Sequence, residues 1–557
     1  MPGAHRSGRA GTIFWVLWLI LFLLYYPAAK AGFVTDFTGW LDQVRNHSFQ
    51  EYINRTNFHA QSLYQFTQLV TYIFYKLFGT NPWLWHLLFI TLHAANATLL
   101  FIFCNRLFQD SGIAIGRTLS FTAAVLFCIS PYMSEVIVWE PSFHFLQGLL
   151  FILLILTGVQ QFLYTGKGKH ALWATLFYLM SVFALEVFYI TPWLILALAI
   201  FYHFNPIIDK ARAKKVLLYF FLPSLSIFIL RMLLFREVYG YFISRIGTDA
   251  VSGIQVSALG KPAKYIFHLL FLGRFFPDGI KQHIYDFCDS TTDIAVFYGI
   301  VVLLLIYILV RFRRMGGKAR VASLLFIYSL ITLALLIPLW FGNILLVLFD
   351  RYNYFTAAFF YPLFVVMATF ITIKYLRLGI VALFALANLR FAIKVSRYWG
   401  KSARINHELL ANLPAPGNKT IILLNLPESM NGIPMIGSDK ESEYKLMHNL
   451  LRPSQPLNNT VYDVLSYNLT TPGDGAHVTV ANDSTIHVTL SQWGTWWWFA
   501  GKGGYSYENV DYKLNLIDAG HWYELTLKKP AQNYLILYET GGHWKAVDMA
   551  KKNEDQY

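Results

Sequence analysis

Charged residues are scarce in this chain. They make up only 14% of its 557 residues, whereas 56% are hydrophobic and 17% are aromatic. Because a soluble domain carries roughly 25% charged residues, this composition excludes a soluble globular protein. The sequence instead predicts a polytopic membrane protein, whose apolar helices face lipid.

Cysteine is also rare, and what there is follows no pattern. Cys104, Cys128 and Cys288 are widely separated, and two of them lie in apolar segments. Their spacing fits neither a disulfide framework nor a zinc site. We therefore expect no metal site built from cysteine.

The net charge of +14 would suggest a nucleic-acid partner if the protein were soluble. Here, however, many of the basic residues lie in short loops between apolar runs, where Lys and Arg mark the cytoplasmic face of a membrane. We therefore expect membrane lipids, and no nucleic acid, as partners.

Long apolar stretches dominate the first 395 residues. A transmembrane helix needs about 20 apolar residues, and on this criterion we expect about eleven spans. They lie near 13–29, 83–104, 118–138, 143–163, 171–187, 189–204, 215–235, 292–312, 321–348, 355–374 and 377–395.

The charges of the loops give an independent test of this topology. Every second loop is basic, which predicts a cytoplasmic N-terminus and an extracytoplasmic tail. The basic residues concerned are Arg106, Arg117, Lys167, Lys169, Lys210, Arg212, Lys214, Lys215, Arg311, Arg313, Arg314, Lys318, Arg320, Lys374 and Arg377. The N-terminus also resembles a signal peptide that ends at Ala29-Lys30-Ala31. We favour its retention as the first span, because the apolar run is long.

Three extracytoplasmic pieces follow from this topology. The transmembrane domain, residues 1–395, carries loops at 30–82 and 236–291. The tail, 396–557, contains short alternating runs such as Thr485–Leu490, which predict half-buried strands. The predicted fold class is a mainly α polytopic membrane protein with a C-terminal β-rich extracytoplasmic domain.

A single carboxylate stands just after the first span. Asp36 is the candidate catalytic residue of the chain, although a surface carboxylate is usually only solvated. Further acids recur at the predicted outer ends of spans, namely Glu135, Glu140, Glu186 and Asp350. Because charges beside spans tend to face a cavity, this recurrence predicts a polar cavity that opens outward.

Basic residues on the same side break the positive-inside pattern. Arg351 and Arg274 are two of them, and each could simply reach toward lipid head groups. Alternatively, the guanidinium offers a two-pronged donor that suits phosphate. A carboxylate beside such a group fits transfer of a sugar from a polyprenyl phosphate to an acceptor hydroxyl. In that reaction Asp36 accepts the proton of the hydroxyl and Arg351 holds the phosphate leaving group.

Three stretches of the sequence resemble a known superfamily. They are Thr35-Asp36-Phe37, the run from Trp85 to Asn96, and Asp350-Arg351-Tyr352-Asn353-Tyr354. Together they resemble the C-superfamily (GT-C) of membrane glycosyltransferases, and especially the bacterial relatives of transmembrane O-mannosyltransferases with tetratricopeptide tails. The resemblance implies an essential acid at Asp36, Arg351 with Tyr352 near the phosphate, and an inner-membrane location in a bacterium.

Two departures limit what this resemblance implies. Many relatives pair two acids in the first loop, whereas Asp36 stands alone here, which puts a metal-binding role of this loop in doubt. The tail shows no 34-residue helical repeat. A divalent metal is therefore possible but not assigned, and the acceptor stays open as a glycan, a lipid or a protein.

Further candidates for substrate contact are Glu140, Glu186 and His93. His93 and Asn96 share a helix face, and we favour hydrogen bonding between helices over substrate contact for both. Two other functions remain open for the chain. One is an oligosaccharyltransferase or ligase that uses a polyprenyl-pyrophosphate-linked glycan. The other is a transporter of lipid-linked sugars, which the lack of an internal duplication makes less favoured.

Overall fold

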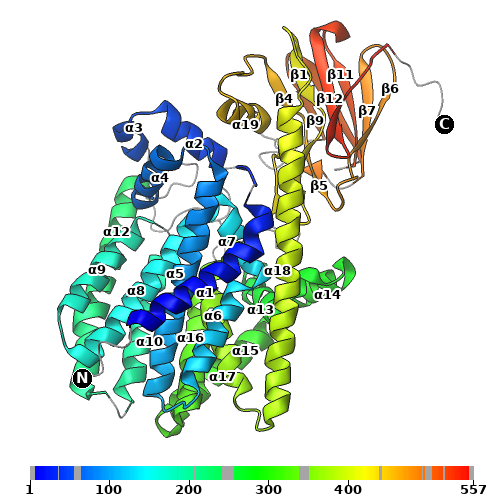
Figure 1. Cartoon of the computed structure of the whole chain (residues 1–557). Coiled ribbons are helices and arrows are strands. Elements are labelled where there is room, and N and C mark those ends of the chain that lie inside the picture. The colour runs from blue at the N-terminus through cyan, green and yellow to red at the C-terminus, as the bar shows by residue number, and fades with distance from the viewer. Residues whose placement is uncertain are drawn as a thin grey trace.

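A computed structural model of the chain shows a helical bundle and a β-rich domain at one end of it (Figure 1). It describes residues 7–29, 31–34, 37–54, 64–184, 186–205, 208–240, 256–337, 350–437, 442–491, 494–495, 505–518 and 521–550. The predicted fold class, a mainly α polytopic membrane protein with a β-rich C-terminal domain, is confirmed, while the side of the membrane on which that domain lies stays a prediction. We call the end of the bundle that carries the β-rich domain the upper end.

Helices occupy all eleven stretches predicted to be spans. The helices are α1 (Ser7–Tyr25), α5 (Pro82–Asp110), α6 (Gly116–Cys128) with α7 (Ser134–Val138), α8 (Phe143–Thr165), α9 (Lys169–Val182), α10 (Thr191–His203), α11 (Lys210–Val216) with α12 (Leu222–Tyr239), α15 (Thr291–Arg311), α16 (Gly317–Leu333), α17 (Tyr354–Ala368) and α18 (Lys374–Ala411).

Fewer than eleven of these are long and apolar enough to cross a bilayer alone. Among the described residues seven segments meet that test, and the pair α6 and α7, bent by 56°, makes an eighth. The helices α9, α10 and α17 have 14, 13 and 15 residues, short of the roughly 20 that a bilayer needs. The chain is a multi-pass membrane protein, and seven or eight of the predicted spans meet this test of length and composition within the described residues.

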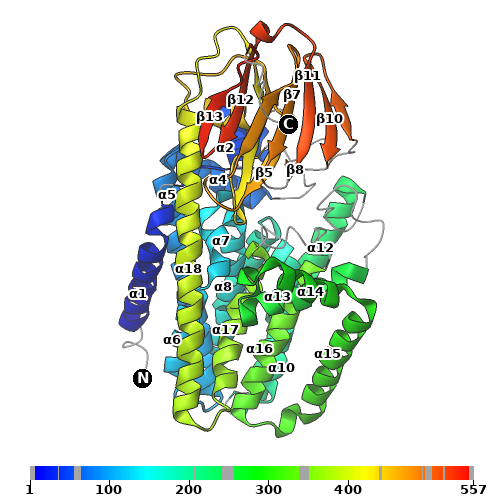
Figure 2. The ribbon, with the colours of Figure 1, turned by 90° about the vertical axis from the view of Figure 1, so that its right-hand side faces the viewer.

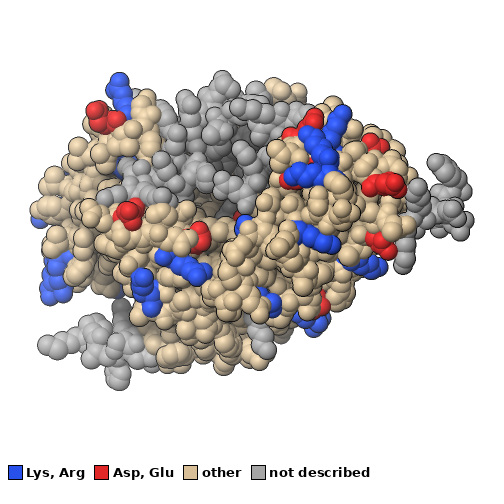
Figure 3. Space-filling view, turned by 90° about the horizontal axis from the view of Figure 1, so that it is seen from above, with Lys and Arg blue, Asp and Glu red and all other residues tan. Residues whose placement is uncertain are grey.

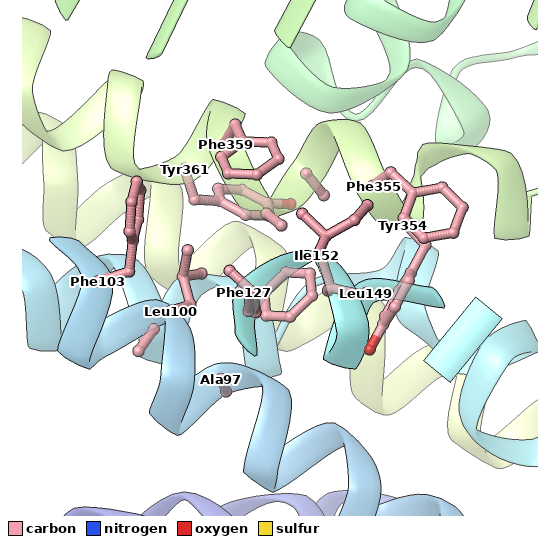
Figure 4. Packing of buried hydrophobic residues seen from close by; sticks show 14 of the residues in the cluster. Ala97, Leu100, Phe103, Phe127, Leu149, Ile152, Tyr354, Phe355, Phe359 and Tyr361 are labelled. Carbon is pink, nitrogen blue, oxygen red and sulfur yellow. The ribbon is translucent and has the colours of Figure 1, made fainter. Parts of the chain in front are cut away.

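The bundle core is packed by aromatic and aliphatic side chains from several helices (Figure 4). Phe103, Phe127, Ile152 and Phe359 come from α5, α6, α8 and α17, and all four are fully buried. Lipid tails are as apolar as these side chains, so close packing rather than escape from water holds such helices together. The aromatic residues, 17% of the chain, supply much of that contact area.

Two groups of helices connect the spans at the upper end. The first loop forms α2 (Phe37–Asn46), α3 (Phe49–Asn54) and α4 (Gln65–Phe78), and the second forms α13 (Lys261–Phe271) and α14 (Asp278–Asp289). In Figure 2, α13 and α14 lie crosswise to the spans, below the β-rich domain.

Short 3-10 helices link the spans where the acidic residues lie. They are η2 (Pro131–Met133), η3 (Glu140–Ser142), η4 (Glu186–Tyr189), η7 (Gly273–Phe275) and η11 (Asp350–Asn353).

The C-terminal domain follows directly from α18 and contains three small sheets and the helix α19 (Glu443–Leu451). The first sheet has the order β13-β12-β1-β4, the second β6-β7-β11-β10-β9 and the third β3-β2-β5-β8. The strands are β1 (Thr420–Leu423), β2 (Leu426–Met430), β3 (Ile433–Pro434), β4 (Val461–Asp463), β5 (Ser466–Leu469), β6 (Ala476–Val480), β7 (Thr485–Leu490), β8 (Gly494–Thr495), β9 (Ser506–Glu508), β10 (Tyr512–Asp518), β11 (Trp522–Leu527), β12 (Tyr534–Thr540) and β13 (His543–Ala546).

The burial patterns of β1, β7 and β11 match their positions in the sheets. β1 lies between two parallel neighbours, and its run Ile421–Leu423 is fully buried, as expected for a strand covered on both faces. β7 and β11 pair antiparallel and alternate between buried and partly exposed residues. The strands predicted from alternation in the tail are therefore confirmed.

Candidate functional site

Two buried ion pairs meet at the residues that lead into α17. Asp350 pairs with Arg274 of η7, and the next residue, Arg351, pairs with Glu135 of α7. The backbone N–H of Arg351 also donates to Glu135 Oε2 over 2.7 Å. The η11 segment thereby joins two distant parts of the chain through adjacent residues of opposite charge.

The local conformation explains why these neighbours point to different partners. In a 3-10 helix successive side chains are turned by roughly 120°, so Asp350 and Arg351 cannot face the same side of η11. The side chains of Asp350 and Arg274 are 1% and 4% exposed, and those of Glu135 and Arg351 are 6% and 12% exposed. Removing one member of such a pair would leave an uncompensated buried charge, which costs about 3–5 kcal/mol.

Arg274 connects this site to the C-terminal domain. Its second terminal nitrogen, Nη2, donates to the backbone carbonyl of Asn431, between β2 and β3, over 2.8 Å. A sharp turn aims Arg274 there: Leu272 has φ +56°, and a Cβ on Gly273 would lie 2.2 Å from the ring of Phe267. Burial lowers the pKa of Arg274, yet a guanidinium stays charged at neutral pH.

Glu140 is a buried acid of a different kind. It is fully buried at the start of η3, and neither carboxyl oxygen has a hydrogen-bond partner among the described residues. His86 Nε2 lies 3.7 Å from Glu140 Oε1 but also 2.9 Å from the carbonyl of Ala31. Buried polar groups are nearly always hydrogen-bonded, so Glu140 stays a candidate for contact with a substrate.

Part of the first loop lies beside Glu140. On either side of residues 35 and 36, which the structure does not describe, the loop is held by a side-chain contact. The carbonyl of Ala31 contacts His86 at one end, while the Thr38 hydroxyl donates to Glu443 of α19 over 2.5 Å at the other. Phe33 and Val34 are buried between these points. Asp36 itself lies outside the described residues, so its position opposite Arg351 stays a prediction.

Aromatic rings enclose the guanidinium of Arg351. Its Cζ lies 4.6 Å from the ring centroid of Trp139 and 5.0 Å from that of Tyr352. Tyr352 also meets Phe145 edge-on. Such contacts with ring faces stabilise a buried cation and hold it in one orientation.

The remaining predicted site residues, His93 and Glu186, have no described contact with the two ion pairs. The Tyr354 hydroxyl accepts a hydrogen bond from Asn96 Nδ2 over 2.9 Å and lies 2.9 Å from His93 Nδ1, while Asn96 also donates to the carbonyl of Leu146. His93 and Asn96 therefore bond between α5, α8 and α17, and contact with a substrate stays a prediction for His93. Glu186 begins η4, and its side chain lies outside the described residues.

Some residues of the two ion pairs and their contacts were not assigned roles from the sequence. Glu135 and Asp350 were noted only as acids at the outer ends of spans, and nothing in the sequence pointed to Asn431, which contributes a backbone carbonyl. The available signal was the presence of isolated charges within apolar surroundings. Their pairing depended on contacts between residues up to 216 positions apart.

No metal-binding group of three or more His, Cys, Asp or Glu side chains occurs among the residues that the structure describes. Acidic and basic side chains lie mixed over the upper face of the molecule (Figure 3).

Comparison with known proteins gives distant structural neighbours. No family model and no curated protein sequence matches the chain. A structure of ArnT from Cupriavidus metallidurans in the apo state is 12% identical, covers 83% of this chain and 93% of its own, and has a TM-score of 0.34. Another, of ArnT bound to undecaprenyl phosphate, is 11% identical, covers 93% and 98%, and has a TM-score of 0.35. Likeness this distant identifies neither a family nor a substrate.

Proposed function

We propose that the chain is a membrane glycosyltransferase of the C-superfamily. It transfers a sugar from a polyprenyl-phosphate carrier to an acceptor hydroxyl at the upper end of the bundle. The observation that carries this proposal is the grouping of two buried Arg–carboxylate pairs and the unpaired Glu140 beside the first loop. Anion-binding groups and a carboxylate at the level of the lipid surface suit a substrate that is itself carried by a lipid.

Arg351 is the residue assigned to the phosphate. Its pair with Glu135 is buried, and rings of Trp139 and Tyr352 fix the guanidinium. As the glycosidic bond breaks, negative charge develops on the phosphate oxygen, and a cation that is already oriented stabilises it without reorganisation. Arg274, held by Asp350 and Asn431, adds a second positive charge to the same end of the bundle.

Asp36 is assigned as the general base. The acceptor hydroxyl attacks the anomeric carbon from the face opposite the phosphate, its proton passes to Asp36, and the carrier phosphate leaves, so the sugar configuration inverts. The fixed points at Ala31 and Thr38 hold the loop that carries Asp36. Glu140, beside His86 and under this loop, is assigned to substrate hydroxyl groups.

The test compares glycosylation in cells that lack the gene with cells that regain it. Mass spectrometry of the lipid, glycan and protein fractions should show one sugar lost on deletion and restored by the wild-type chain. Asp36→Asn and Arg351→Met should not restore it. Asp42→Asn is the matched control, because Asp42 lies in the same loop and accepts a hydrogen bond from Asn46 within its own helix turn.

A binding measurement separates the two roles. Purified chains are titrated with polyprenyl phosphate in detergent, and native mass spectrometry counts the bound lipid. Arg351→Met should weaken binding about tenfold, the loss of a charge-assisted contact of 1.5 kcal/mol or more, while Asp36→Asn should bind normally. Full restoration of the sugar by Asp36→Asn would refute the assignment of the base.

A further inference from the structure

The long helix α18 extends far beyond the membrane. Its 38 residues span about 57 Å at 1.5 Å per residue, nearly twice the roughly 30 Å of a hydrocarbon core. It runs along the outside of the bundle and carries the C-terminal domain at its upper end (Figure 2). The middle of α18 must therefore pass through the head-group layer of the bilayer.

The exposed face of α18 changes from apolar to basic along its length. Leu383 and Leu386 are 71% and 64% exposed. Beyond them the exposed residues include five cations at spacings of four, three, four and three, which places them on one face of the helix. They are Arg390, Lys394, Arg397, Lys401 and Arg404.

These five cations are not neutralised within the described part of the protein. No carboxylate there lies within 4.0 Å of any of them, although ten ion pairs form elsewhere. The ammonium group of Lys394 lies 6.0 Å from the ring of Phe275 and 5.8 Å from that of Tyr398. The basic face can therefore receive an anionic ligand from outside.

A close contact with α1 places this face at the membrane surface. A Cβ on Gly400 would lie 2.8 Å from the carbonyl oxygen of Pro27, so only glycine allows α18 to approach there. Pro27 lies at the upper end of the first span, Ala10–Ala28. Gly400 and the cations around it are thus level with the end of that span, where lipid phosphates lie.

Two grooves follow this face and match the shape of a lipid. The lower groove, of about 610 Å³, is lined by Leu386, Leu389 and Ile393 as well as by Lys394. The upper groove, of about 770 Å³, is lined by Arg397, Lys401 and Arg404 and also by Glu408. Cations line both grooves, and the lower one adds apolar side chains, so together they offer contacts for the acyl chains and the anionic head group of a lipid.

We propose that the basic face of α18 binds anionic glycerophospholipid, with acyl chains against Leu386 and Ile393 and phosphates against Arg397, Lys401 and Arg404. The five cations from Arg390 to Arg404 span 14 residue steps, about 21 Å of helix, which exceeds what a single carrier phosphate can contact. The face also lies on the outer wall of the bundle, whereas Arg351 is buried inside it. Bulk lipid is therefore a better match to this face than the sugar carrier, and the inference does not depend on the proposed enzymatic activity.

The experiment measures lipid retained by the purified full-length chain. Native mass spectrometry after exchange into detergent with equal amounts of phosphatidylglycerol, phosphatidylcholine and undecaprenyl phosphate gives the bound ratio of the three lipids. The test variant is Arg397→Gln/Lys401→Gln/Arg404→Gln. The matched control is Lys419→Gln/Lys513→Gln/Lys545→Gln, which removes the same charge from exposed positions of the C-terminal domain.

The wild type and the control should bind more phosphatidylglycerol than phosphatidylcholine. In the test variant the bound ratio of phosphatidylglycerol to phosphatidylcholine should fall about tenfold or more, because each cation at the membrane surface contributes about fivefold to the binding of anionic lipid. A charge-conserving variant, Arg397→Lys/Lys401→Arg/Arg404→Lys, should keep it and shows that the helix is intact. An unchanged preference in the test variant overturns the proposal. So does a preference for undecaprenyl phosphate over phosphatidylglycerol that disappears in the test variant.

Discussion

Variants of the ion pair between Glu135 and Arg351 can show separately how the pair affects stability and how Arg351 affects activity. Both side chains are nearly buried, and Glu135 also accepts the backbone N–H of Arg351. Arg351→Met leaves the carboxylate of Glu135 buried without its cation. Two unit charges about 4 Å apart attract by roughly 4 kcal/mol at an effective dielectric of about 20, and breaking a buried pair costs about 3–5 kcal/mol.

The double variant Glu135→Gln/Arg351→Met should recover most of that loss. Glutamine keeps an oxygen that can accept the backbone N–H of residue 351, and it carries no charge to desolvate. We expect the double variant to lie within about 1 kcal/mol of the wild type, which corresponds to a coupling energy of about 3 kcal/mol or more. Transfer activity should stay lost in the double variant, because no cation is left to hold the phosphate.

Unfolding in mixed micelles of mild detergent and sodium dodecyl sulfate, followed by tryptophan fluorescence, gives the four free energies of the cycle. Restoration of the missing sugar in cells that lack the gene gives the activity. A double variant that folds like the wild type and also glycosylates normally would refute the assignment of Arg351 to the phosphate. A coupling energy near zero would refute the buried ion pair itself.

Three further predictions follow from other contacts. Burial raises the pKa of Glu539 from 4.5 to about 8, so the folded protein holds this proton more tightly than the unfolded chain. The contribution of Glu539 to stability should be fully present below about pH 4.5 and be lost by up to 1.4 kcal/mol per pH unit up to about pH 8. Glu539→Gln should remove this contribution from the pH dependence of the unfolding free energy, and a pH dependence identical to that of the wild type would contradict it. Glu443→Ala removes the acceptor of the Thr38 hydroxyl, and hydrogen exchange in α2 should accelerate about tenfold or more, whereas no acceleration would show that this contact does not dock the loop. Tyr354→Phe removes the hydroxyl that accepts from Asn96 and should cost about 1–2 kcal/mol in the same micelle assay; a loss near zero would show that this interhelical bond contributes nothing.

The C-terminal domain contributes to the candidate site, which its position in the sequence did not suggest. Its Asn431 carbonyl holds Arg274, and its Glu443 holds Thr38 in the first loop. Both contacts reach segments that flank the predicted reaction centre. The tail domain therefore restrains the geometry of the upper end of the bundle.

The sequence by itself determined the class of protein, the stretches that form helices and the alternating strands of the tail. These features depend on local composition and periodicity, which neighbouring residues alone express. Hydropathy did not reveal the lengths of α9, α10 and α17, which have 14, 13 and 15 residues.

The tertiary structure alone decided which charges pair and which stay unpaired. Arg351 could have faced lipid or phosphate on sequence grounds, and the fold instead places it against Glu135, 216 positions away. Glu140 and Glu135 are acids only five residues apart, yet one is paired and the other has no hydrogen-bond partner among the described residues. Such differences arise because the energy of a buried charge depends on its surroundings in three dimensions, and separation along the chain carries no information about them.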